Sequence, residues 1–188
     1  MSEPELALPL DGADRKELLR IARATLREHL ATGYLPPGAP HRKTLLQPAA
    51  AYVTVQVAGV LRGCMGRVEA DKPLYLAIEE LTVAAISRDP RFEPVRLEEL
   101  SETRVAISIL SALEPCALER VEVGRHGLVV TRGPRRGLIL PHAAIENGWS
   151  AERLLDEVCA KAGLGPGAWR DPDTRVEQFT ADRFAEPD

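Results

Sequence analysis

Residues 52–66 read YVTVQVAGVLRGCMG and predict a β-hairpin around which the other elements are arranged. Valine alternates with polar residues over positions 52–58, which is the pattern of a strand with one buried face. Gly59 supplies the turn, and residues 60–66 form the return strand. A regular partner strand therefore supports the second half of the hairpin, where the chemically distinctive residues lie.

Two of these residues, Arg62 and Cys64, are expected to share one face of the return strand, with Leu61 on the other, because side chains in a strand alternate. A nearby cation favours thiolate over thiol, and thiolate is the form that attacks electrophiles. Cys64 is therefore a candidate catalytic or ligand-contacting thiol, and Arg62 its activating cation. The alternative is that Cys64 is a small buried hydrophobe, as most free cysteines are.

Two glycines and a later loop are candidate ligand-binding positions. Gly63 and Gly66 interrupt the return strand, and glycine inside a strand often marks a bulge or the close approach of a ligand or another backbone. Arg88, Asp89 and Arg91 follow a predicted helix, and this loop could hold an anion over the same face, with the two arginines supplying guanidinium groups. The structural alternative is that the cations compensate the helix dipole and the Asp-Pro step forms a turn.

The composition of the chain excludes several classes of protein. Its 188 residues carry a formal net charge of −4, which argues against a nucleic-acid partner. The three cysteines are far apart, with no CxxC and no paired histidine spacing, so neither a disulfide framework nor a metal site is predicted, and no cofactor is implied. Without a leader sequence or a membrane-length apolar segment, the protein is expected to be cytoplasmic, with no membrane partner.

Outside the hairpin, helical and strand patterns are mixed, which predicts an α+β fold with a mainly antiparallel sheet packed with helices. Residues 1–12 are expected to be a flexible tail, and residues 13–188 a single domain. Helices are predicted to begin at the capping residues Asp14, Asp71 and Ser150. Further strands are predicted at residues 103–111, 116–123, 127–131, 138–140 and, as a final edge strand, 175–179.

A cysteine nucleophile normally needs a base, and His142, just after a strand end at a helix start, is the favoured candidate. A surface histidine is the alternative. The hairpin that carries Arg132, Arg135 and Arg136 could contact RNA or phosphate. Arginines at a hairpin tip are more often part of a solvated turn that protects a sheet edge.

Six segments occur in a fixed order along the chain: LRGCMG (61–66), RDPRF (88–92), GRHGL (124–128), RGLILP (136–141), GW (148–149) and CAKAGL (159–164). In this order they resemble the AMMECR-type family, whose prokaryotic members are called AmmeMemoRadiSam system protein A. The resemblance implies an α+β fold of one larger and one smaller lobe. It also implies gene association with a Memo-family protein and a radical S-adenosylmethionine protein. Two positions depart from the family pattern: Met65 stands where Ile is usual, and His142 where Gln is expected.

Three functions are compatible with these residues. The favoured one is a binding component that presents a substrate to the Memo-family and radical-SAM partners, with a ligand pocket at the LRGCMG segment, because no complete acid–base pair is visible. The first alternative is an enzyme that uses Cys64 as nucleophile or acceptor. The second is an RNA- or phosphate-binding module that uses the hairpin at residues 132–136. Whether the chain is an enzyme is left open, and a monomer and a homodimer are both compatible with the sequence.

Overall fold

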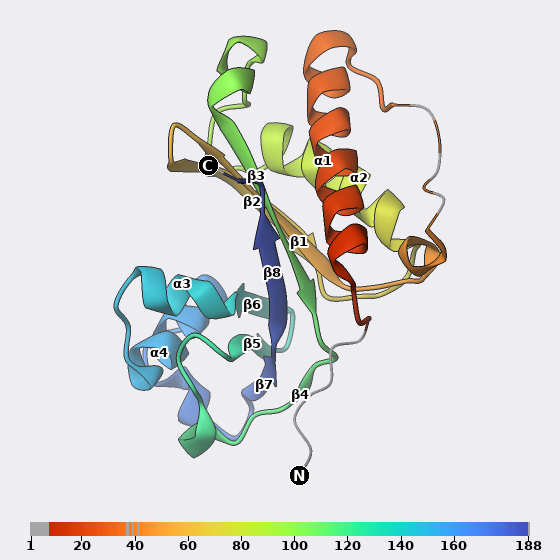
Figure 1. Ribbon diagram of the computed structural model, residues 1–188. Helices are drawn as coiled ribbons and strands as arrows, with labels where there is room; N and C mark the ends of the chain where they lie inside the picture. The colour runs from red at the N-terminus through yellow and green to blue at the C-terminus, as the bar shows by residue number, and fades with distance from the viewer. Residues whose placement is uncertain (1–7, 37, 39, 41, 188) are drawn as a thin grey trace. The chain divides into compact units, whose positions relative to one another are not determined.

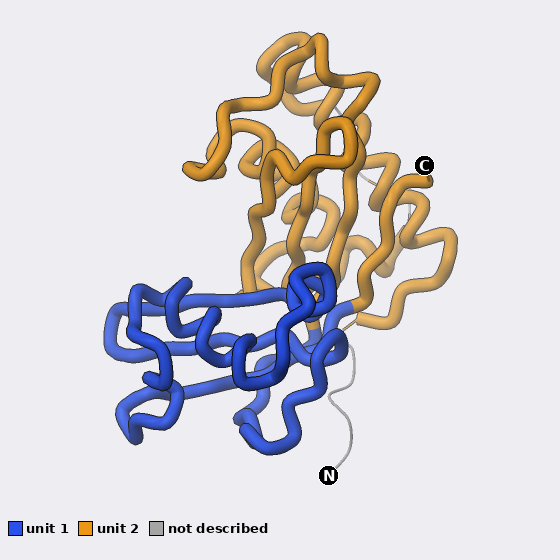
Figure 2. The backbone as a smooth tube through the Cα atoms, turned by 90° about the vertical axis from the view of Figure 1, so that its left-hand side faces the viewer, with its two compact units in different colours: residues 1–6, 111–181 blue, residues 7–110, 182–188 orange. Residues whose placement is uncertain are grey.

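The predicted hairpin forms two strands of a four-stranded antiparallel sheet, and a second four-stranded sheet forms further along the chain. The structure, a computed structural model, describes residues 8–36, 38, 40 and 42–187. Each sheet belongs to its own unit (Figure 2): of the described residues, the larger unit holds 8–110 and 182–187, and the smaller holds 111–181. The α+β fold class is confirmed.

The larger sheet has the order β2-β1-β3-β8, so β2 is an edge strand and the last strand of the chain is the opposite edge (Figure 1). Its strands are β1 (Ala51–Val57), β2 (Val60–Arg67), β3 (Thr103–Leu110) and β8 (Ala181–Ala185). Ala58 and Gly59 connect β1 to β2 with φ angles of 48° and 78°. Positive φ at both residues of a two-residue hairpin loop is typical of the type I′ turn, which matches the right-handed twist of the strands.

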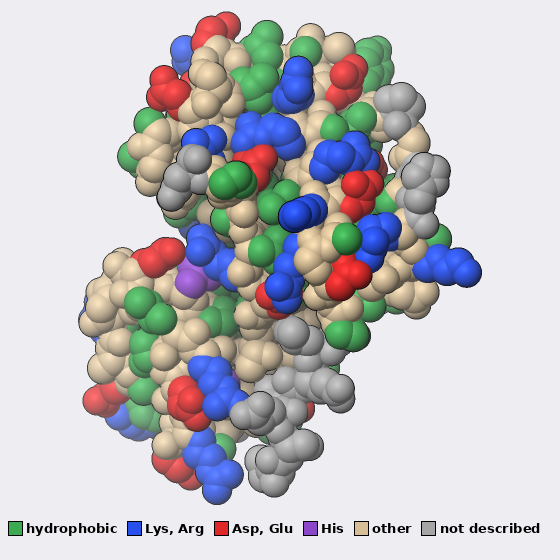
Figure 3. All heavy atoms as spheres, viewed as in Figure 1, with side chains coloured by type: hydrophobic (Ala, Val, Ile, Leu, Met, Phe, Trp, Pro, Cys, Tyr) green, Lys and Arg blue, Asp and Glu red, His purple; other side chains and the backbone are tan. Residues whose placement is uncertain are grey.

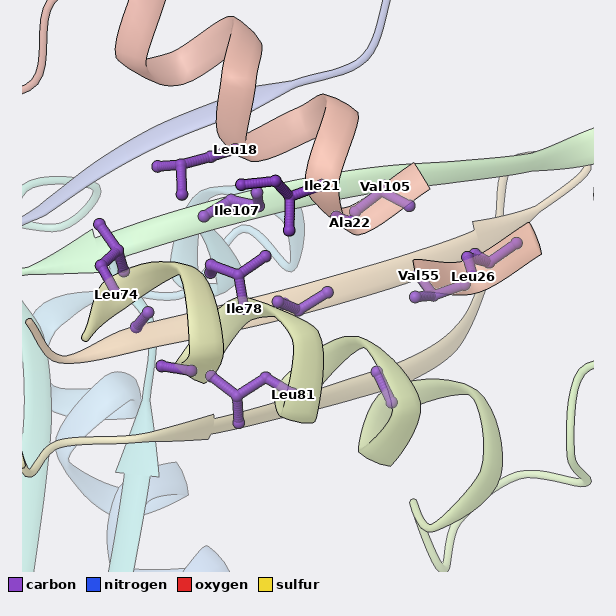
Figure 4. Packing of buried hydrophobic residues seen from close by; sticks show 14 of the residues in the cluster. Leu18, Ile21, Ala22, Leu26, Val55, Leu74, Ile78, Leu81, Val105 and Ile107 are labelled. Atoms are coloured by element: carbon purple, nitrogen blue, oxygen red, sulfur yellow. The ribbon is translucent and has the colours of Figure 1, made fainter. Parts of the chain in front are cut away.

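Two helices, α1 (Gly12–Thr32) and α2 (Leu74–Ser87), cover the valine face of this sheet. Figure 4 shows Ile107 beside Ile21 of α1, and Val55 beside Leu26 of α1, and all four side chains are buried. Their burial removes a continuous apolar layer from water and provides the main stabilisation of this unit. Two short 3₁₀ turns, η1 (Lys43–Leu46) and η2 (Leu97–Glu102), connect the elements.

The helix starts differ in part from the prediction. Asp11, not Asp14, caps α1: its side chain accepts a hydrogen bond from the Asp14 N–H at 2.7 Å, and the Asp14 carboxylate accepts one from the Asp11 N–H. Pro73, not Asp71, precedes the first residue of α2. Of the predicted tail, residues 1–7 lie outside the described part of the chain, and Leu10 is buried in the core of the larger unit.

The smaller unit is built around a sheet of order β4-β7-β5-β6. Its strands are β4 (Glu114–Pro115), β5 (Gly127–Arg132), β6 (Arg135–Ile139) and β7 (Arg175–Phe179), its helices are α3 (Pro141–Glu146) and α4 (Ala151–Lys161), and its short turns are η3 (Leu118–Arg120) and η4 (Ala168–Arg170). Leu128 and Val130 of β5 pack with Leu154 and Val158 of α4 in a separate core. Ser150 caps α4 as predicted, by accepting a hydrogen bond from the Arg153 N–H.

Two strand predictions are wrong: one predicted strand does not form, and one predicted edge strand lies inside its sheet. Residues 116–123 contain the turn η3 instead of a strand. Residues 175–179 do form β7, but this strand pairs with both β4 and β5, so it is interior and not an edge. No helix in the described part of the chain combines the length and apolar character needed to cross a membrane.

Candidate functional site

A β-bulge at Arg62 changes the predicted arrangement of the LRGCMG segment. Cys64 pairs with Thr54 on β1, and Gly63 with Val55, but Leu61 pairs with Gln56, so Arg62 is one extra residue in the register. Leu61 therefore lies on the face of the sheet that carries Cys64, and its predicted position on the opposite face is wrong. The strict alternation used in the prediction does not hold at the bulge.

The Arg62 guanidinium is held by two neighbours outside the strand. It forms an ion pair with the carboxylate of Glu99 in η2, and its Nη2 donates a hydrogen bond to the carbonyl oxygen of Glu93 at 3.2 Å. This hydrogen bond from Arg62 is the main reason that the pKa of Glu99 lies below its ordinary value. The charge that was predicted to act on Cys64 is thus compensated by a carboxylate.

The backbone of Cys64 is hydrogen-bonded to the loop after α2, whereas its side chain contacts the neighbouring strand β1. Its N–H donates to Oδ2 of Asp89 at 2.9 Å, and its carbonyl oxygen accepts from Nη2 of Arg91 at 3.4 Å. Its half-buried Sγ lies 3.5 Å from the Thr54 hydroxyl, which donates to it. The loop after α2 therefore holds the backbone of Cys64 by hydrogen bonds, and the Arg91 guanidinium also interacts with the thiol through its charge.

Asp89 is the centre of this loop contact, which we call the Asp89 clamp (Asp89 and Arg91 bonded to the backbone of Cys64). The buried Asp89 carboxylate accepts from the backbone N–H, Nε and Nη2 of Arg91 as well as from the N–H of Cys64. These donors, Arg91 first, lower the pKa of Asp89 to about 2. Asp89 and Arg91 thus bind each other and the strand edge at Cys64, and their role in ligand binding stays a prediction.

Arg88 does not take part in the clamp. It is the exposed residue at the C-terminus of α2, where its charge complements the helix dipole, and it lines a separate hollow with His29 and Leu35. Arg88 thus lies outside the Asp89 clamp, and binding of an anion by Arg88, Asp89 and Arg91 stays a prediction.

The two glycines of the segment are explained by packing. A Cβ atom on Gly63 would lie 1.9 Å from the carbonyl oxygen of Ala85 in α2, and one on Gly66 would lie 2.1 Å from the ring of Tyr52. The protein itself fills these spaces, so neither glycine forms the floor of an open hollow on that side. Both predicted features of such glycines are observed: a bulge directly precedes Gly63, and other protein atoms approach both glycines closely.

An open hollow of about 740 Å³ lies beside β2, and we call it the β2 hollow. It is lined by Arg62, Arg91, Phe92, Glu93, Arg96, Glu98 and Glu99. Three guanidinium groups and three carboxylates thus surround one aromatic ring, and Arg91 lies over that ring at 5.1 Å from its centre. Basic and acidic side chains are also mixed over the face of the molecule in Figure 3, so this face presents no field of a single sign.

Five of the residues that line this hollow were not among the predicted site residues: Phe92, Glu93, Arg96, Glu98 and Glu99. The available signal was the run of charged residues from Glu93 to Glu99, which directly follows the RDPRF segment. Because Arg62 and Glu99 are far apart in sequence, their ion pair depends on the fold.

The remaining predicted residues belong to the smaller unit. His142 is half-buried in the first turn of α3, and its role as a base for Cys64 stays a prediction. Arg132 forms an ion pair with Asp171 and donates to the Thr174 hydroxyl at 2.9 Å, while Arg135 donates to the Gly163 carbonyl oxygen at 3.1 Å. These contacts favour the structural interpretation of the arginine-rich hairpin.

The described residues contain no group of three or more His, Cys, Asp or Glu side chains that could hold a metal ion. One of the three acids that line the β2 hollow, Glu99, is paired with Arg62 instead. Chemistry in this hollow would therefore depend on guanidinium groups, carboxylates and one aromatic ring.

Comparison with known proteins gives one consistent result. The family model described as AMMECR1 matches residues 19–184. A protein from Methanothermobacter thermautotrophicus is 41% identical over 95% of this chain and 97% of its own length, and one from Aeropyrum pernix is 40% identical over 95% and 80%. The crystal structure of uncharacterized protein PH0010 from Pyrococcus horikoshii superimposes with a TM-score of 0.86 at 37% identity, over 90% of each chain.

Proposed function

Because the chain belongs to the AMMECR1 family, we propose that it acts as a binding component of a modification system that includes Memo-family and radical S-adenosylmethionine proteins. Its ligand is a polypeptide segment of a partner or protein substrate, which occupies the β2 hollow. The association with these partners rests on the resemblance of the six sequence segments, and the location of the site rests on the geometry around β2.

The observation that carries this proposal is the convergence of two of those segments at one sheet edge. The Asp89 clamp fixes the RDPRF loop against Cys64 of the LRGCMG segment, and the same loop supplies Arg91 and Phe92 to the hollow. Buried carboxylates cost free energy unless they are fully hydrogen-bonded, and Asp89 meets that condition. The clamp therefore gives the hollow a rigid wall, which reduces the entropy lost on binding.

The charges of the hollow indicate the class of ligand. Three arginines and three glutamates surround Phe92, so a polyanion would meet as much repulsion as attraction. A polypeptide carries charges of both signs and an apolar side chain for the ring, and its charge pattern can match the wall. A peptide segment fits this surface better than a nucleic acid or a phosphorylated metabolite.

Binding is favoured over catalysis by the surroundings of the thiol. A cysteine nucleophile needs a base within hydrogen-bond reach, as in the Cys–His pairs of many enzymes. Within the larger unit, the polar side chain that contacts Sγ of Cys64 among the described residues is the hydroxyl of Thr54. A hydroxyl is a weak base, so the geometry supports a structural thiol beside a binding surface.

Binding of the Memo-family and radical-SAM proteins of the same organism tests the proposal. We expect each purified protein, or one of them, to bind the full chain by calorimetry or biolayer interferometry. The double variant Phe92→Ala, Arg96→Glu removes the ring and reverses an exposed charge, so it is expected to weaken binding about tenfold or more.

The matched control is Lys16→Glu, which makes the same charge change at an exposed position of α1 away from the hollow. It is expected to bind like the unmodified chain. Equal loss of binding in Lys16→Glu would show that net charge, and not the hollow, determines affinity. Absence of binding to both partners would reject the proposal.

A further inference from the structure

Glu79 in α2 is a buried residue that lines a cavity, and its carboxylate has no partner among the described residues. Its residue is only 7% exposed, and no hydrogen bond or ion pair to another described residue satisfies its side chain. Buried carboxylates are rare unless they are paired, because removal of the charge from water is costly. Each such group in a native structure therefore needs an explanation, and an absent ligand is one of the few available.

The carboxylate lies at the wall of a cavity of about 90 Å³ between the two long helices of the larger unit. The other lining residues are Arg20, Ile21 and Ala24 of α1, Pro36, Gly38 and Pro40 after the end of α1, and Tyr75 of α2. Figure 1 shows α1 and α2 side by side, and in Figure 4 Ile21 extends from α1 toward α2. A cavity of this size has room for several water molecules or a short alkyl chain.

Arg20 does not neutralise Glu79, although both residues line the cavity. Its Nε and Nη2 donate to the two carboxylate oxygens of Glu17 at 2.8 and 2.7 Å. This bidentate contact, which is the first cause of the raised pKa of Arg20, commits the guanidinium to Glu17. Glu79 is left with apolar and aromatic walls, and burial raises its pKa, with a further contribution from the charge of Glu80.

We propose that this cavity binds a primary ammonium group, with the charged head against Glu79 and the attached carbon chain along Ile21, Ala24 and Tyr75. One carboxylate with apolar walls suits an alkylammonium ion, because the carboxylate pairs with the charge and the walls bury the methylene groups. A divalent metal ion would need several more oxygen ligands, and the described residues place no second acid in the cavity. The ligand is either a free alkylamine or the side chain of a lysine in a polypeptide, and both share this chemistry.

The test is a titration of the full chain with n-butylamine, followed by two-dimensional amide NMR. We expect saturable shifts confined to residues of α1, α2 and the adjoining loop. Glu79→Gln keeps the shape of the side chain and removes its charge, and it is expected to weaken binding at least about tenfold. Glu152→Gln, at an exposed acid of α4 that lines neither the cavity nor the β2 hollow, is the matched control and is expected to bind butylamine unchanged.

A second variant and a neutral probe keep the proposal falsifiable. Ala24→Leu fills the cavity and retains Glu79, so it is expected to abolish binding even if Glu79→Gln is poorly folded. n-Butanol has the same carbon chain without the charge and is expected to bind at least about tenfold more weakly than butylamine. Equal binding of butanol and butylamine, or undiminished binding by Glu79→Gln, would overturn the proposal.

The two possible sources of the ammonium group are separated by a second ligand, N-acetyl-lysine N-methylamide. If it binds at least as tightly as butylamine, the cavity accepts lysine side chains of polypeptides. If butylamine alone binds, the cavity accepts small free amines. Because the cavity and the β2 hollow share no lining residue, the double variant Phe92→Ala, Arg96→Glu is expected to bind butylamine normally.

Discussion

The edge strands β2 and β6, one in each unit, both carry a glycine that lies directly under a helix, but their strand registers differ. In each, a helix lies so close that only glycine fits: a Cβ on Gly63 would lie 1.9 Å from the Ala85 carbonyl oxygen, and one on Gly137 would lie 2.6 Å from the Val158 carbonyl oxygen. However, β6 pairs with β5 in an unbroken register, whereas β2 carries a bulge at Arg62.

The difference shows which features of β2 require an explanation other than packing. A glycine under a helix is common to both units, so Gly63 does not by itself mark a binding site. Three features are found at β2 and are not shared by β6: the bulge, the contact of the buried Asp89 carboxylate, and the ion pair between Arg62 and Glu99. Irregular and costly features of this kind are concentrated at functional sites, which supports the β2 hollow as the binding surface.

The largest expected effect comes from Gly63→Ala, which tests whether the helix contact is as tight at β2 as the geometry indicates. The added methyl group collides with backbone atoms of α2, so we expect a loss of about 3 kcal/mol or more in the free energy of unfolding, measured by urea denaturation. Gly137→Ala is expected to cost less, about 2 kcal/mol.

Gly12→Ala is the control for both glycine variants, because a Cβ at Gly12 meets no atom within 4 Å. It is expected to leave stability within about 1 kcal/mol of the unmodified chain. A cost at Gly63 no larger than that at Gly12 would contradict the close approach of α2.

The next largest effect on stability compares Asp89, the buried acid that contacts β2, with Asp156 in the smaller unit. All four donors around Asp89 use both carboxylate oxygens, so Asp89→Asn would point an amide N–H₂ at other donors and is expected to cost about 2 kcal/mol. In the smaller unit, Asp156 accepts from the Gly167 N–H and from Nε1 of Trp169 with a single oxygen. Asp156→Asn can keep both bonds and is expected to cost less than about 1 kcal/mol.

The stabilisation from Asp89 also depends on pH in a defined direction. Its pKa in the folded chain, about 2, lies below the ordinary value of 3.8, so the carboxylate stabilises the fold above pH 4 and this contribution is lost as the pH falls through about 2. We expect the stability difference between the unmodified chain and Asp89→Asn to shrink by about 1–2 kcal/mol from pH 7 to pH 2. A difference that is independent of pH would exclude an ionised Asp89.

A smaller effect compares the thiols of the two units. Burial raises the pKa of Cys116 to about 11, with a contribution from Glu119, and burial also raises the pKa of Cys159. Both thiols of the smaller unit are thus poorly ionised at pH 8, and iodoacetamide is expected to modify the half-buried Cys64 about tenfold faster, as followed by peptide mass spectrometry. Faster modification of Cys116 would contradict this order.

The smallest effect concerns the other buried acids. Because the pKa of Glu79 is raised in the folded chain, its favourable contribution is present at low pH and is lost as the pH rises through that pKa. Glu79→Gln is therefore expected to stabilise the ligand-free chain by roughly 1 kcal/mol at pH 8 and to have less effect at pH 4, measured by urea denaturation. Glu177→Gln in β7 removes the partner of Arg175 and is expected to be neutral or slightly destabilising, and the opposite ranking would contradict an unpaired Glu79.

Local patterns were sufficient to predict the hairpin, the cap of α4 and the α+β class. The bulge at Arg62 was not predictable, because one inserted residue leaves the composition of a strand unchanged and only the partner register reveals it. The strand β8 was also missed: its sequence, ADRFA, has little strand character, and its place at the sheet edge is determined by tertiary contacts.

The candidate site shows the same division between local and long-range information. The sequence identified the LRGCMG and RDPRF segments as important, but not that Asp89 binds the backbone of Cys64, since that contact joins residues 25 positions apart. The predicted partnership of Arg62 with Cys64 assumed a regular strand, and the bulge together with Glu99 directs the guanidinium elsewhere.

The Asp89 clamp also has a consequence for encounters between copies of the chain. Exposed edge strands are where sheets of separate molecules join, through unpaired backbone donors and acceptors. At Cys64 both outward groups are already bonded, to a carboxylate and to a guanidinium, so an incoming strand would have to expel an ionised side chain from the interior before it could pair there. The loop after α2 thus prevents a strand of another molecule from pairing with β2 at Cys64.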